Sequence, residues 1–91
     1  MSNTRMDLAS MKTYEAALEA FITDVKNRCS TMQGGISAAN AFMKDDTSQT
    51  ILKKSEMAVQ AIENCLPSAE RLLELVRAEI DHLNQQPSLG L

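Results

Sequence analysis

Apolar residues recur at alternating steps of three and four in two stretches of this chain, separated by one short polar segment. The first stripe is Leu8, Met11, Glu15, Leu18, Ile22, Val25, Cys29, Met32, Ile36, Ala39 and Met43. The second stripe is Leu52, Ser55, Val59, Ile62, Leu66, Ala69, Leu73, Val76, Ile80 and Leu83. Such spacing places each set on one side of an α-helix. The segment between them is only long enough to reverse the chain, so we predict an all-α fold of two long antiparallel helices in a helical hairpin.

The polar segment also sets the expected boundaries of the two helices. Asp46 and Gln49 have the spacing of a capping box at the start of the second helix, with Thr47 and Ser48 as competing caps. After Leu83 the apolar period is lost. We therefore predict a flexible N-terminus over 1–7, a hairpin over 8–84 made of helix 8–44, turn 45–47 and helix 48–84, and a disordered tail over 85–91.

Two helix-breaking signals lie inside these predicted helices. Gly34 and Gly35 each cost about 1 kcal/mol relative to Ala, yet the stripe continues in phase from Met32 to Ile36. Pro67 removes a backbone donor. Two interpretations stay open there: a kink near residue 67 in one helix, or a break that divides the second helix in two.

Composition and charge exclude several classes of function. The net charge is −3 and the basic residues are scattered, which argues against a nucleic-acid partner. No apolar run approaches the ~18–20 residues that cross a bilayer, and the polar start of the chain is unlike a Sec signal peptide. Cys29, Cys65 and the single His82 do not form a zinc set. We expect no catalytic residues, no cofactor, no metal and no membrane span.

If residues of the two helices are paired outward from the turn, Cys29 and Cys65 lie opposite each other. Cys29 lies on the first stripe and Cys65 beside Leu66 of the second. One interpretation is a pair of small buried apolar residues, since free Cys is commonly buried. The other is a disulfide between Cys29 and Cys65, formed after export to an oxidising compartment.

The side of the first helix away from its stripe carries small and almost uncharged residues. It could be a helix-favouring alanine surface, or it could lie under another protein. Two packed helices leave both edges of their seam exposed to water, and packing against further helices would bury these edges. We predict that a partner completes a four-helix bundle or coiled coil at an interface of Ala17, Ala20, Phe21, Ser30, Gly34, Ala38 and Phe42.

This architecture resembles the WXG (Trp-X-Gly) family of small type VII, or ESX, secretion substrates and its divergent relatives that accompany LXG toxins. Met43 stands where the family has Trp at the hairpin turn, and Asp45 where it has Gly. Thr47 takes the place of the small residue that follows. Phe42 and Asp46 have the Phe-X-X-X-Asp form of some LXG-partner proteins. The family's C-terminal export motif is absent, because this chain has a single Tyr near its start.

The resemblance implies a non-enzymatic partner protein of a bacterial type VII secretion system. It would bind the helical N-terminal domain of a larger LXG-type toxin, or a second small hairpin protein, and aid export of that substrate. The chain would be cytoplasmic before export and then secreted by a Sec-independent route. Two other classes stay open: a cytoplasmic homodimeric adaptor or secretion chaperone of another system, and a self-assembling needle or filament subunit.

Overall fold

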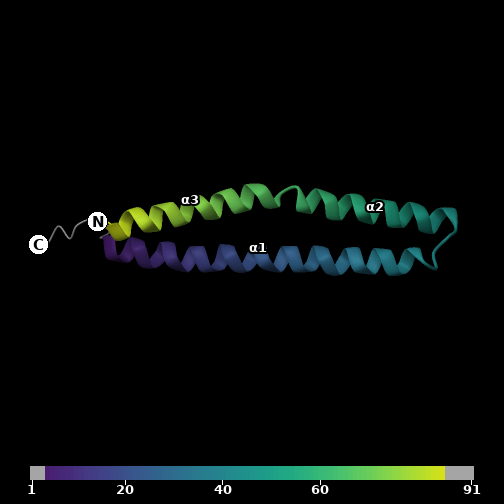
Figure 1. Cartoon of the computed structure of the whole chain (residues 1–91), viewed down its shortest axis with the longest axis horizontal. Helices are drawn as coiled ribbons and strands as arrows, with labels where there is room; N and C mark the ends of the chain where they lie inside the picture. Colours follow the sequence, from purple (N-terminus) through teal and green to yellow (C-terminus); the bar gives the residue numbers. More distant parts are fainter. Residues whose placement is uncertain (1–3, 86–91) are drawn as a thin grey trace, which may run out of the picture.

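Three α-helices form an elongated hairpin in this computed structural model, which describes residues 4–85 (Figure 1). They are α1 (Thr4–Asn40), α2 (Asp46–Glu63) and α3 (Leu66–Gln85). Helices α2 and α3 follow one line, here called the second rod, and this rod runs antiparallel to α1 (Figure 1). The all-α hairpin predicted from the two stripes is confirmed.

The seam between α1 and the second rod is built from the two predicted stripes. Its buried side chains, each 5–8% exposed, are Ile22, Cys29, Ile36, Leu52, Val59, Leu73, Val76 and Ile80. Met32 and Ile62, which the period also placed on the stripes, are instead 47% and 49% exposed. A seam between only two helices buries one narrow strip on each, so stripe residues nearer its edge stay in contact with solvent.

The turn lies earlier than predicted. Helix α1 ends at Asn40 instead of residue 44, and 41–45 connects it to α2. The amides of Phe42 and Met43 both donate to the Ala39 carbonyl, at 3.0 and 2.8 Å, which tightens and closes the last turn of α1. Met43 then packs against the seam. The residues that follow Met43 therefore cross to the second rod and cannot extend α1.

Asp45, and not Asp46, caps the start of α2. Its backbone is extended, with φ −72° and ψ 161°, and its carboxylate accepts from the Ser48 amide at 3.0 Å and the Ser48 hydroxyl at 2.6 Å. These hydrogen bonds hold the pKa of Asp45 below its usual value. Gln49 does not close a capping box. Its side-chain amide donates to the Asn40 side chain at 2.9 Å and to the Met43 carbonyl, which ties the turn together.

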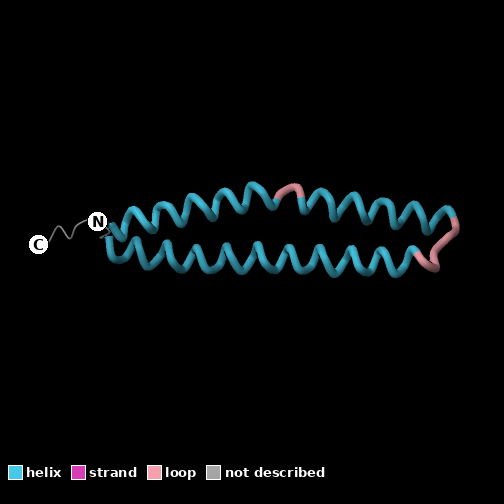
Figure 2. The backbone as a smooth tube through the Cα atoms, viewed as in Figure 1, coloured by secondary structure: helices cyan, strands magenta, loops and turns pink. Residues whose placement is uncertain are grey.

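The second rod is interrupted at Asn64 and Cys65, just before Pro67 (Figure 2). Proline has no amide to reach the carbonyl four residues earlier, and its ring crowds that carbonyl. For Pro67 this carbonyl belongs to Glu63, the last residue of α2. The second rod nevertheless stays in register across the interruption, because Leu73, Val76 and Ile80 of α3 remain buried against α1.

The ends of the hairpin also differ from the sequence-based boundaries. The predicted flexible segment 1–7 includes Thr4–Asp7, which belong to α1. No glycine or proline separates these residues from Leu8, so the helix extends back through them. The remaining predicted terminal residues, 1–3 and 86–91, lie outside the described part of the chain.

Candidate protein-binding face

One flank of the seam is closed by polar contacts between α1 and the second rod. The Lys26 ammonium lies 2.6 Å from a carboxylate oxygen of Glu70. Two turns further along α1, the side-chain amide of Gln33 donates to both carboxylate oxygens of Glu63, at 3.1 and 3.2 Å. These residues directly follow stripe positions on both rods. The polar contacts between α1 and the second rod therefore lie along one edge of the hairpin, which we call the polar flank.

Arg77 explains why a carboxylate occupies a stripe position near the start of α1. Its Nε atom donates to Glu15 at 2.8 Å, and its Nη2 atom lies 3.0 Å from a carboxylate oxygen of Glu19. The hydrogen bonds to Glu15, and then to Glu19, raise the pKa of Arg77 above its ordinary value. Glu15 thus belongs to the polar flank as well as to the stripe.

The opposite flank of the seam is apolar. Its apolar side chains either directly precede stripe positions or are themselves the stripe positions nearest that edge. In the described part of the chain, eight of the nine large apolar side chains that stay exposed belong to it, and we call them the apolar face: Tyr14, Phe21, Met32, Phe42, Ile51, Ile62, Leu72 and Leu75. The ninth, Met57, lies on the side of α2 away from α1. The hairpin therefore has one charged edge and one apolar edge.

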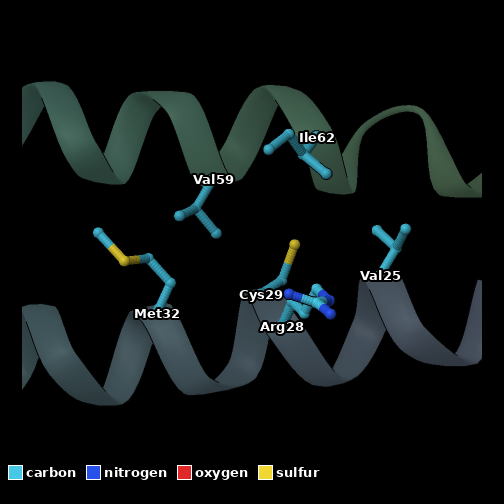
Figure 3. Close-up of a pocket in the computed structure, with 6 residues that line it drawn as sticks. All are labelled: Val25, Arg28, Cys29, Met32, Val59 and Ile62. Atoms are coloured by element: carbon cyan, nitrogen blue, oxygen red, sulfur yellow. The ribbon is translucent and has the colours of Figure 1, made fainter.

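A cavity of about 210 Å³ opens within this apolar face where α1 passes the end of α2. Its lining is almost entirely apolar: Val25, Cys29, Met32, Val59 and Ile62, with Arg28 as the one charged member. Figure 3 shows Cys29 directed toward the second rod, with Met32 and Val25 on either side of it along α1. The half-exposed Met32 and Ile62 are thus the two walls of a shallow apolar recess.

The predicted interface residues are all exposed, but they divide between two surfaces. Phe21 and Phe42 belong to the apolar face. Ala17 and Ala38 lie one helical turn before these two aromatic residues and border the same face. The other three predicted members, Ala20, Ser30 and Gly34, lie on the side of α1 away from both flanks.

Sequence reasoning missed the members of the apolar face on the second rod. Ile51 and Leu72 directly precede Leu52 and Leu73, as Phe21 precedes Ile22 on α1. That repeated position, one residue before a stripe member, was the available signal. Only the pairing of the rods shows that these positions meet along one edge, because antiparallel helices bring like flanks together.

The cysteines and the turn residues have separate structural settings. Cys29 is buried in the seam, whereas Cys65 is exposed, and both are free thiols. The Cys65 thiol donates to the Ala61 carbonyl at 3.4 Å. Among the turn residues, Met43 packs on the seam and Asp45 caps α2. Asp46 and Thr47 are exposed in the first turn of that helix.

Within residues 4–85, no helix is both long and apolar enough to cross a membrane. The same part of the chain contains no group of three or more His, Cys, Asp or Glu placed to hold a metal ion. The chain matches no known protein family, no curated protein and no solved structure. Its extended shape and exposed apolar residues are what a protein-binding hairpin presents.

Proposed function

We propose that this chain is a non-enzymatic helical partner protein whose apolar face is covered by helices of another polypeptide. The observation that carries the proposal is the difference in polarity between the two flanks of the seam. Ion pairs close one flank, while eight large apolar side chains line the other. Helices that laid an apolar stripe on this face would complete a four-helix bundle and remove that surface from water.

Within this proposal, the partner is the helical N-terminal domain of a larger type VII secretion substrate of the LXG class. The resemblance of the hairpin and its turn string to WXG-like proteins supports this choice. Binding would shield the apolar helices of the substrate in the cytoplasm and present the pair for Sec-independent export. The alternative is a homodimeric adaptor or secretion chaperone, in which a second copy covers the same face.

Co-expression with the protein encoded by the neighbouring gene tests the proposal. We expect a 1:1 complex by light scattering coupled to size exclusion, because the two apolar faces bury each other. Ile51→Glu, at a position 53% exposed on the apolar face, should abolish the complex. Met57→Glu is the matched control, since Met57 is on the same helix and 65% exposed but lies off that face.

The results separate the candidate functions. A complex that survives Ile51→Glu but is lost with Met57→Glu would place the binding surface elsewhere. A chain that never pairs with the neighbouring protein, yet holds a stable dimer, would favour the adaptor or chaperone. A chain that stays a soluble monomer in both conditions would contradict both functions.

A further inference from the structure

The interruption in the second rod divides the hairpin into two halves (Figure 2). The inner half contains the turn, α2 and the part of α1 that faces α2, and the outer half contains α3 and the start of α1. Lys26 of α1 contacts α3, and Gln33 contacts the last residue of α2, so the interruption lies opposite residues 26–33. Helix α1 is continuous through this level. Only the second rod is therefore divided.

The buried side chains of the seam fall into two groups, one in each half. The inner group is a core cluster between α1 and α2: Cys29, Ile36, Leu52 and Val59. The outer group lies outside that cluster, between α1 and α3: Ile22, Leu73, Val76 and Ile80. Ile22 belongs to the outer group because Glu19 and Lys26, on either side of it, both contact α3. The seam is thus two smaller cores that follow one another along α1.

The seam is least filled where these two groups meet. The recess of about 210 Å³ opens there, and its lining comes from α1 and the last turns of α2. Figure 3 shows one lining residue, Ile62, beside the point where the second rod leaves its helix. A cavity leaves the atoms around it without partners on one side, so contacts that would join the two groups are missing there. Side-chain packing therefore couples the two halves weakly.

The backbone of the second rod also couples the halves weakly. The amides of residues 64 and 65 donate to carbonyls of α2, at 2.9 and 3.0 Å, and so complete α2 without involving α3. Pro67 has no amide with which to reach the carbonyl of Glu63. Two residues outside any helix are enough to absorb a change in direction between the helices that they join.

We infer that Asn64 and Cys65 form a hinge about which α3 undocks from α1 as one unit, while α1 and α2 stay packed. Helix α3 is the part that moves, because α2 is tied to α1 by the turn at 41–45 as well as by the seam. Beyond its buried side chains, α3 is held to α1 by the ion pairs of Lys26 and Arg77. Ion pairs that solvent reaches contribute little to stability.

The hinge determines whether the apolar face is complete. Four members of the face belong to the outer half: Tyr14, Phe21, Leu72 and Leu75. The other four belong to the inner half: Met32, Phe42, Ile51 and Ile62. A partner that covers the whole face binds only the closed hairpin, and its binding therefore holds α3 in place. This consequence rests on the proposed function, whereas the hinge is a property of the chain alone.

Hydrogen exchange of the full chain, followed by mass spectrometry of its peptides, tests the hinge. After correction for intrinsic rates, we expect the amides of α3 and of residues 8–25 to exchange at least about tenfold faster than those of residues 29–40 and 52–62. The reason is that undocking of α3 opens the outer half and leaves the inner half closed. Equal exchange in the two halves would overturn the inference.

Two matched core variants show whether the halves open separately. Val76→Ala should speed exchange of the outer half about tenfold and leave the inner half unchanged, because it removes buried methyl groups from the outer group alone. Val59→Ala is its match, since Val59 is 5% exposed and Val76 6% exposed. It should speed exchange of the inner half and change that of the outer half by no more than about twofold. Faster exchange throughout the chain in Val76→Ala would contradict a hinge.

Pro67→Ala tests the position of the hinge. Pro67 is exposed, so the change removes no buried contact, and the new amide can donate to the Glu63 carbonyl and join α2 to α3 in one helix. Exchange of α3 should then slow toward that of α2, and Val76→Ala added to this variant should speed both halves alike. Ser68→Ala, at the next exposed position, keeps Pro67 and should keep the difference between the halves.

The outcomes separate this inference from the proposed function. If Pro67→Ala leaves α3 exchanging independently of α2, the interruption is not the hinge and the inference fails. A 1:1 complex with the neighbouring protein could still form in that case. Conversely, two halves that exchange separately in a chain that forms no complex would support the hinge and contradict only the proposed function.

Discussion

Asp45 joins the turn to α2 through a single carboxylate, and its protonation is therefore linked to stability. Its pKa is lowered in the folded chain by hydrogen bonds from Ser48, so its stabilising contribution is complete above the pKa of an unfolded Asp and is lost as the pH falls through the lower, folded pKa. Asp45→Ala should lower Tm by about 4 °C at pH 7.

Asp45→Asn is the matched control, because Asn caps helices as well as Asp does but does not titrate. We expect it to keep most of the wild-type Tm at pH 7 and to lose the part of the acid dependence that Asp45 contributes. Thermal melts followed by circular dichroism between pH 2 and 7 make the comparison. Equal Tm values for the Ala variant and the wild type at pH 7 would show that the cap contributes nothing.

Single residues also mark where sequence reasoning reached its limit. The stripes located the buried seam, because the helical period alone determines which residues share a side. Glu15 could be placed on a stripe, but its role depends on Arg77, a residue on the other rod. The choice of Asp45 over Asp46 as cap depends on where α1 ends. That end is set by the turn in which the Phe42 and Met43 amides both donate to the Ala39 carbonyl, which no local pattern specifies.

At the scale of the element, α1 is continuous through Gly34 and Gly35, whose backbones are helical without any apparent need for glycine. A Cβ atom built at either position meets nothing within 4 Å. Gly34→Ala should therefore stabilise the hairpin by about 0.5–1 kcal/mol, because Ala favours the helix over the unfolded chain. Urea unfolding at fixed protein concentration measures this gain.

Gly34→Ala also tests the outward surface of α1 that includes Ala20, Ser30 and Gly34. A helix packed closely there would collide with the new methyl group, and the variant would lose assembled mass in light scattering. We expect no such loss, since the apolar face lies on a different side of α1. Ala20→Arg, a larger change on the same outward surface, should likewise leave assembly intact. A loss with both variants would return the interface to the small-residue surface.

At the scale of the whole molecule, the two cysteines differ in how readily another chain can reach them. The thiol of Cys65 is exposed and can meet a thiol of another chain, whereas the thiol of Cys29 is buried. Treatment with diamide, which takes up the two thiol hydrogens as the disulfide forms, should therefore link two chains through Cys65. Non-reducing electrophoresis should show a covalent dimer that persists in Cys29→Ser and disappears in Cys65→Ser.

The same oxidation tests the disulfide considered between Cys29 and Cys65. That bridge would join residues of one chain, and peptide mapping of a monomeric product would identify it. Its formation in place of the covalent dimer would require Cys65 to approach the buried thiol of Cys29, with Cα atoms within about 7 Å.

The polar flank limits how far any assembly of this protein can grow. A subunit with binding surfaces on two sides can keep adding neighbours. It then forms fibres, as heterologous contacts do when they do not close into a ring. Here the ion pairs of Lys26 and Arg77 satisfy the second edge within each chain. Once the apolar face is covered, the polar flank presents solvated charges, and they favour water over a third molecule. This difference between the flanks fits the proposed carrier, which pairs with one partner, better than a filament subunit.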